Sequence, residues 1–172
     1  MLVQTQSAVL SDWRTSKEKA KEGTDCISLR SSQLKHLRLV GCCYIPDGCL
    51  AAAAKKFPLL EELHIYLSHI NKDQIEVVGH SCPLLKSFTL NAHGFIGYQS
   101  NDEALAVARK MPELRHLSLF GNALAYESLF PILDGCPHLE SLDLRHCYNI
   151  DLDEGDLERR CKQQIVALKG TS

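Results

Sequence analysis

Eight cysteines and eight histidines have the most versatile chemistry in this chain, because thiolates and imidazoles bind zinc and also serve as catalytic groups. A structural zinc site favours ligand pairs such as Cys-x-x-Cys, and no such pair occurs. The close Cys and His neighbours are His80/Cys82, Cys136/His138 and His146/Cys147, in separate stretches. We therefore expect no bound metal and no cofactor.

Nucleophilic catalysis would need a nucleophile, a base and an orienting group. The nearest combination is His116 with Ser87 or Ser141, and no nucleophile-elbow or phosphate-loop motif accompanies it. A chain of 172 residues, 45% of them apolar, forms a core without disulfides, so we expect reduced thiols. The chain is predicted not to be an enzyme. A thiol or zinc enzyme stays as an alternative and predicts one unusually reactive cysteine or a stoichiometric metal.

Net charge and hydropathy limit the classes of partner that the chain can be expected to bind. A net charge of -2, from 19 basic and 21 acidic residues, provides no polycationic surface, so nucleic acid is not an expected partner. The start, up to Asp12, lacks a basic region followed by an apolar run, and no segment approaches the ~18 apolar residues of a membrane span. We expect no membrane partner and a cytoplasmic or nuclear location, or both.

An internal repeat organises the chain. Five segments follow the pattern Leu-x-x-Leu-x-Leu with conservative replacements: Leu34-Leu37-Leu39, Leu60-Leu63-Ile65, Leu85-Phe88-Leu90, Leu114-Leu117-Leu119 and Leu139-Leu142-Leu144. Their first leucines are 26, 25, 29 and 25 residues apart. A proline two positions before four of these leucines ends the preceding helix and favours an extended segment after it. Each repeat therefore predicts a strand, a turn and a helix.

Repeats of this length predict an α/β leucine-rich-repeat solenoid, a horseshoe of about five strand-helix repeats. A short parallel sheet forms the concave side, and the helices form the convex side. A C-terminal capping helix is predicted from Leu157, Cys161, Ile165 and Leu168, which recur at helical spacing. We assign residues 24–172 to this domain and residues 1–23 to an N-terminal tail, partly disordered or helical.

Two further features belong to the repeat. The eighth residue after each first leucine is polar or a thiol, and we expect it to satisfy free backbone amides of the turn: Cys42, Ser68, His93, Asn122 and Cys147. The third repeat is about four residues longer than its neighbours, and the surplus falls in residues 92–100. This segment is predicted to be a protruding loop, either a contact point or a tolerated insertion.

The side chains between the strand leucines should line the concave face, because successive strand residues alternate between faces. We predict that they bind a ligand: His36, Arg38, Glu62, His64, Tyr66, Thr89, Asn91, His116, Ser118, Phe120, Asp143 and Arg145. Tyr66 and Phe120 are either interface anchors or ordinary exposed aromatics. Arg38 and the two nearby histidines are either a patch for an acidic segment or a solvated face.

The segments 31–42, 80–86 and 132–145 resemble the plant F-box/LRR-repeat proteins with cysteine-containing repeats. The most specific string is Asp134-Gly135-Cys136-Pro137-His138-Leu139-Glu140-Ser141-Leu142-Asp143-Leu144-Arg145. In that family an N-terminal F-box docks on a Skp-type adaptor of an SCF ubiquitin ligase, and the repeats hold the protein substrate. The resemblance thus implies a protein-interaction module that recognises substrates for ubiquitin-dependent degradation.

The resemblance does not extend to the F-box, a compact helical unit that begins with a Leu-Pro pattern. Only 33 residues precede the first repeat, so we expect no F-box and no docking on a Skp-type adaptor. The alternative is a stand-alone leucine-rich-repeat binding protein, or a truncated paralogue without the F-box and without a ligase link.

Overall fold

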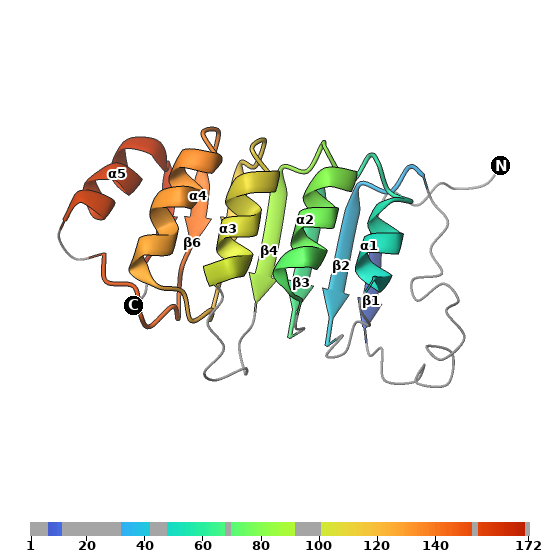
Figure 1. The fold of residues 1–172 in the computed structure, drawn as a ribbon, viewed down its shortest axis with the longest axis horizontal. Helices are drawn as coiled ribbons and strands as arrows, with labels where there is room; N and C mark the ends of the chain where they lie inside the picture. The colour runs from blue at the N-terminus through green and yellow to red at the C-terminus, as the bar shows by residue number, and fades with distance from the viewer. Residues whose placement is uncertain are drawn as a thin grey trace.

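The computed structural model describes residues 7–11, 32–41, 48–67, 70–91, 101–152 and 155–170. Within these ranges, seven strands form one parallel sheet in chain order (Figure 1). The strands are β1 (Ser7–Ser11), β2 (His36–Val40), β3 (Glu62–Tyr66), β4 (Ser87–Asn91), β5 (His116–Ser118), β6 (Ser141–Asp143) and β7 (Ala167–Lys169). Each described strand pairs only with its immediate predecessor and successor, as in a solenoid.

The helices stack beside one another along one side of the sheet, as Figure 1 shows. They are α1 (Cys49–Ala54), α2 (Lys72–Ser81), α3 (Asn101–Lys110), α4 (Leu129–Gly135), which a 3₁₀ turn at Tyr126–Ser128 precedes, and α5 (Asp156–Gln164). The predicted leucine-rich-repeat solenoid, with its parallel strands and alternating helices, is confirmed.

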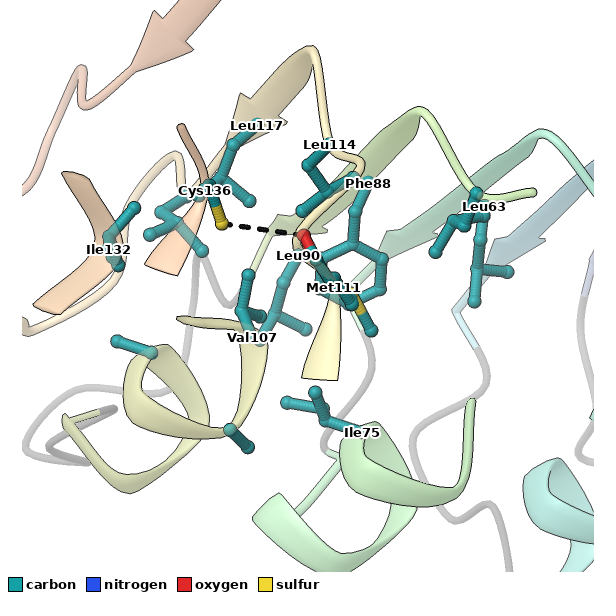
Figure 2. Packing of buried hydrophobic residues seen from close by; sticks show 14 of the residues in the cluster. Leu63, Ile75, Phe88, Leu90, Val107, Met111, Leu114, Leu117, Ile132 and Cys136 are labelled. Carbon is teal, nitrogen blue, oxygen red and sulfur yellow. Dashed lines mark hydrogen bonds between the residues drawn. The ribbon is translucent and has the colours of Figure 1, made fainter. Parts of the chain in front are cut away.

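The repeated leucines form the core between the sheet and the helices. Leu37, Leu63, Phe88, Leu117 and Leu142 occupy equivalent register positions on adjacent strands, and all are buried. Figure 2 shows side chains of the helices, including Ile75, Val107 and Ile132, meeting them from the other side. Since full burial of one such side chain contributes about 1.5 to 3 kcal/mol, this regular stacking stabilises each coil against the next.

The Asn/Cys position of the repeat joins successive coils. Asn122 Nδ2 donates a hydrogen bond to the carbonyl oxygen of Leu90 at 2.7 Å, and Cys147 Sγ donates to that of Leu119 at 2.9 Å. Backbone N–H groups of Asn122 and Gly121 also hydrogen-bond the sulfur of Cys147, so the expectation that this position satisfies backbone amides holds at Cys147. The sequence did not predict that Asn122 and Cys147 also donate to carbonyl oxygens of the preceding coil. The equivalent Cys42, Ser68 and His93 lie outside the described residues.

Two buried thiols make a second set of links between coils. Cys82 Sγ donates to the carbonyl oxygen of Ala54 at 3.7 Å, and Cys136 Sγ to that of Met111 at 3.5 Å, the contact drawn in Figure 2. Burial raises the pKa of each of these thiols to about 11, so they are protonated at neutral pH.

The expectation of reduced thiols holds for part of the described chain. The free cysteines there are Cys82, Cys136, Cys147 and Cys161. It is wrong for Cys49, which is disulfide-bonded. Cys49 itself is buried at the start of α1, so the bond adds a covalent tie at this end of the solenoid.

Both ends of the sheet differ from the prediction. Ser7–Ser11, assigned to a tail that is disordered or helical, form β1 and pair with β2 over their whole length. The predicted closing helix ends at Gln164, so Ile165 follows it and Leu168 lies in β7, which pairs with β6. Two short strands thus extend the five predicted ones. The predicted loop at residues 92–100 lies outside the described residues.

The closing helix α5 is fixed to the last full coil by polar contacts. Gln164 Nε2 donates to the carbonyl oxygens of Leu133 and Cys136, at 3.2 and 2.9 Å, at the C-terminal end of α4. Arg160 forms an ion pair with Asp134 of the same helix. Because the last carbonyls of a helix have no partner within the helix, these contacts satisfy the end of α4 while they attach the cap.

The turns after β2, β3, β5 and β6 have a left-handed backbone. The second residue beyond the last strand leucine has a positive φ in four coils, with 67° at Gly41, 52° at Leu67, 72° at Gly121 and 62° at His146. Glycine adopts this conformation freely, whereas Leu67 and His146 adopt it at a cost of about 1 kcal/mol or more. The repeat imposes the same turn even where the residue type disfavours it.

Candidate functional site

The side chains that point away from the leucines form three rows across the sheet. The first row is His36, Glu62, Ser87, His116 and Ser141, and the second is Arg38, His64, Thr89, Ser118, Asp143 and Lys169. Val40, Tyr66 and Asn91 begin the third row, which Phe120 and Arg145 continue at equivalent positions beyond the shorter strands. The register thus brings ten of the twelve predicted residues to one face of the sheet, and Phe120 and Arg145 follow directly after the strands on that face.

These side chains differ in their exposure. Arg38, His116 and Arg145 are exposed, and most of the others are partly buried. Thr89 and Asp143 are buried, with 7% and 9% of their surface exposed, although both were predicted to belong to an open surface. The reason is that each is engaged by longer polar neighbours, which are His64 for Thr89 and Arg145 for Asp143.

One group of contacts, the N-terminal cluster, consists of His36, Arg38, Glu62, His64, Tyr66 and Thr89. Glu62 Oε2 lies 3.0 Å from Nδ1 of His36 and 3.5 Å from Nε2 of His64. His64 Nδ1 lies 2.8 Å from the hydroxyl oxygen of Thr89. The pattern is satisfied when both imidazoles donate N–H groups to Glu62 and the hydroxyl of Thr89 donates to His64.

The carboxylate of Glu62 is stabilised by this arrangement. Its partial burial alone would raise its pKa, but the hydrogen bonds and charge interactions with His36 and then His64 together outweigh burial and lower the pKa. Glu62 therefore stays ionised while both of its neighbours compete for the same oxygen.

Arg38 is the cationic member of the N-terminal cluster. Its guanidinium carbon lies 4.5 Å from the centroid of the Tyr66 ring, within the range of a cation–π contact. Among the described residues, no carboxylate lies within ion-pair distance of it. Its five N–H donors therefore remain available at the surface while the ring holds the guanidinium plane.

The second group, the C-terminal cluster, consists of Phe120, Asp143, Arg145, His146, Tyr148 and Lys169. Arg145 donates two side-chain hydrogen bonds to Asp143, from Nε at 2.9 Å and from a terminal nitrogen at 2.8 Å. Its backbone N–H donates to the same carboxylate at 3.2 Å, and Lys169 Nζ lies 4.0 Å away. The guanidinium of Arg145 also lies over Phe120, 5.5 Å from the ring centroid.

This ion pair changes the acidity of both partners. Burial alone would raise the pKa of Asp143, but the hydrogen bonds and charge of Arg145, with a smaller effect of Lys169, together lower it. The hydrogen bonds and charge of Asp143 raise the pKa of Arg145. The C-terminal cluster thus contains an arginine whose charge is already matched within the chain.

Aromatic rings extend the C-terminal cluster beyond the predicted residues. The His146 ring meets Phe120 edge-on with centroids 4.8 Å apart, and Tyr148 with centroids 5.9 Å apart. His146 Nδ1 and the Tyr148 hydroxyl are 3.1 Å apart. Sequence reasoning missed these two residues because they follow the strand, where His146 has a left-handed backbone and contacts Phe120, and Tyr148 contacts His146. The aromatic types and this recurrent turn position were the available signals.

Paired charges mark the edge at which the strands begin. Glu61 bridges Lys35 and Lys86, at 2.8 and 3.5 Å, and Arg115 pairs with Glu140. The hydrogen bond and charge of Lys35 lower the pKa of Glu61, and Lys86 adds to this effect. These residues occupy equivalent positions in successive coils, so the pairs connect neighbouring coils along this rim.

Within the described ranges, no group of three or more His, Cys, Asp or Glu side chains is placed to hold a metal ion. In those ranges, likewise, no helix has the length and apolar character needed to cross a membrane.

The parallel strands, stacked helices and repeated leucines define the chain as a leucine-rich-repeat protein of the strand-helix class. It is 47% identical over 146 residues to F-box/LRR-repeat protein 23 of Arabidopsis thaliana, an alignment of 83% of this chain and 32% of that protein. It is 42% identical over 143 residues to F-box protein SKIP19 of the same plant, covering 83% and 46% of the two chains. F-box/LRR-repeat protein 22 of that plant is 46% identical over 138 residues, covering 79% and 44%.

The chain is therefore a relative of the plant F-box/LRR-repeat proteins, and the resemblance noted in the sequence is confirmed. It spans about a third to a half of the length of these relatives, from 32% to 46%. No protein-family model matches the chain.

Proposed function

We propose that this chain is a protein-interaction module that holds another protein on the concave face of its sheet. Its relation to F-box/LRR proteins supports this role and favours a place in an SCF-type ubiquitin ligase pathway, as the part that recognises the substrate. The observation that carries the proposal is the pair of side-chain clusters on the face opposite the helices. As part of the same proposal, the protein works in the cytoplasm, the nucleus or both.

The face has suitable dimensions for a polypeptide partner. Seven strands about 4.8 Å apart make a sheet roughly 29 Å across, enough for an extended peptide or one face of a small domain. A stable interface buries about 800 Å² on each partner. The partly buried rings of Tyr66 and Phe120 are the proposed anchors, because each is oriented by an arginine before a partner arrives.

Removing both anchors tests the proposal. Tyr66→Ala combined with Phe120→Ala should reduce capture of specific partners from plant extract by at least tenfold, measured by quantitative mass spectrometry of affinity-purified complexes, because anchor residues contribute about 2 kcal/mol or more each. Thermal stability should change little. The control is Leu84→Ala, an exposed apolar residue in the turn before β4, which should retain the partners. Equal capture by the double variant and the control would contradict the concave face as the binding surface.

The ligase link needs its own experiment. The chain, and the chain fused to the F-box of a relative, would each be tested for retention by a purified Skp-type adaptor. We expect retention of the fusion only, followed by ubiquitination of the captured partner in a reconstituted ligase. A partner that is captured but never modified by the fusion would favour the second candidate, a stand-alone binding protein that competes for the same ligand.

A further inference from the structure

The two arginines on the concave face have different partners. Arg145 is bound through two side-chain hydrogen bonds to Asp143, so its charge and two of its donors are already used. Arg38 has a cation–π contact with the Tyr66 ring, and no hydrogen bond or ion pair of its side chain occurs within the described residues. A guanidinium matches a carboxylate with two parallel hydrogen bonds, so Arg38 offers all of its donors and an unmatched charge, whereas the charge of Arg145 is already matched by Asp143.

The neighbours of Arg38 leave its N–H donors available to a ligand, because the nearby carboxylate is bound by other side chains. Glu62, the acidic side chain of the N-terminal cluster, is held by His36 and His64 through one oxygen. His64 is itself fixed by Thr89, which is buried. The carboxylate of Glu62 is therefore engaged by the two histidines, and the guanidinium of Arg38 lies over the ring of Tyr66 instead of pairing with it.

The space next to Arg38 suits an extended chain. Val9 of β1 is the register partner of Arg38, and its side chain is 67% exposed. On the other side, His64 continues the same row and is partly buried. A peptide that runs along this row meets the apolar side chain of Val9, then the guanidinium of Arg38 and then the imidazole of His64.

We propose that the N-terminal cluster is a docking site for an acidic segment of the partner protein, whose Asp or Glu carboxylate binds the guanidinium of Arg38. The argument is charge complementarity: Arg38 is the concave arginine without a carboxylate in the described part of the chain, and its orientation is set by Tyr66. The inference rests on the proposed function and specifies the chemistry of its ligand. The C-terminal cluster contributes aromatic contacts to the same partner.

The test uses a fluorescein-labelled decapeptide of glutamate and measures its binding to the full chain by fluorescence anisotropy at low salt. Arg38→Gln should weaken binding by at least tenfold, because a charge-assisted hydrogen-bonded pair contributes about 1.5 to 3 kcal/mol. Arg38→Lys should lie between the two, since lysine keeps the charge and loses the planar fork. Both variants should unfold at the wild-type temperature, because Arg38 is exposed.

The matched control is Arg109→Gln. Arg109 is exposed on α3, on the helical side, and no ion pair involves it in the described part of the chain. This variant should bind the glutamate peptide as the wild type does, and a glutamine decapeptide should bind to neither. Equal losses for Arg38→Gln and Arg109→Gln, or equal binding of both peptides, would overturn the proposal.

Two further outcomes separate related possibilities. If a phosphoserine peptide of low acidity displaces the glutamate probe more than tenfold better than unlabelled glutamate peptide does, the commitment to a carboxylate is overturned. If Arg38→Gln leaves glutamate binding intact while Tyr66→Ala with Phe120→Ala abolishes partner capture, the acidic-segment inference fails and the proposed function stands.

Discussion

The N-terminal and C-terminal clusters contain the same pair of groups, a guanidinium over an aromatic ring, in different electrostatic settings. In the C-terminal cluster the buried Asp143 forms an ion pair with Arg145 and so neutralises its charge. In the N-terminal cluster Glu62 is partly exposed and binds two histidines, and Arg38 has no acidic partner among the described residues. The difference indicates that one arginine contributes to the fold and the other remains available to a ligand.

The largest expected effect comes from removing the carboxylate of each cluster in turn. Asp143→Ala should lower the free energy of unfolding by about 2 kcal/mol, because it removes hydrogen bonds from a charged donor to a buried acceptor. Glu62→Ala should lower it by about 0.5 kcal/mol, the usual range for partly exposed ion pairs. Urea denaturation measures both values. Equal losses would show that the two carboxylates have the same structural role.

The pH dependence of stability distinguishes the clusters next. The pKa of Asp143 is lowered in the folded protein, so its ionised form contributes stability above the unfolded-state pKa of about 3.9, and this contribution is lost as the pH falls through the folded pKa. The stability difference between wild type and Asp143→Asn should therefore be constant from about pH 5 to 7 and shrink in stronger acid. Urea melts at a series of pH values measure it. A difference that grows in acid would contradict the assignment.

The smallest expected effect concerns the buried hydroxyl that fixes His64. Thr89→Val keeps the shape of the side chain and removes the hydrogen bond to the imidazole, so it should cost about 1 kcal/mol in unfolding free energy. Ser118→Ala on the same row is the control, and it should change stability by less than about 0.5 kcal/mol. If Thr89→Val matches the control, the chain of contacts from Thr89 to Glu62 does not order the N-terminal cluster.

The sequence predicted the five central coils correctly because their leucines recur at one spacing, and burial depends only on that spacing. Leu37, Leu63 and Leu142 are buried as the pattern requires. It did not predict β1, whose residues Ser7–Ser11 lack the leucine pattern and become a strand only by pairing with β2. It also placed the end of the closing helix too late, because Leu168 keeps helical spacing while lying in β7.

For the candidate surface, too, the sequence predicts the position of the residues but not the contacts that they make. The period-two alternation of a strand identifies which side chains share a face, and the register places ten of the twelve predicted residues on one face, with Phe120 and Arg145 just beyond the paired strands. Whether such a residue is open or covered depends on its neighbours, so the burial of Thr89 and Asp143 could not be predicted from their own positions. The contribution of His146 depends on a backbone angle that a strand pattern does not contain.

The thiol contacts between coils link the reactivity of the buried cysteines to the separation of those coils. Cys82, Cys136 and Cys147 each hold a proton bonded to the main chain of the coil before them, and a reagent that needs a thiolate reaches them only after those coils have separated. Cys161 lies in the closing helix, Cys136 and Cys147 flank the strand before it, and Cys82 lies two coils before Cys136, nearer the other end. The order in which a slow alkylating reagent marks these four positions would therefore report the end from which the solenoid unravels.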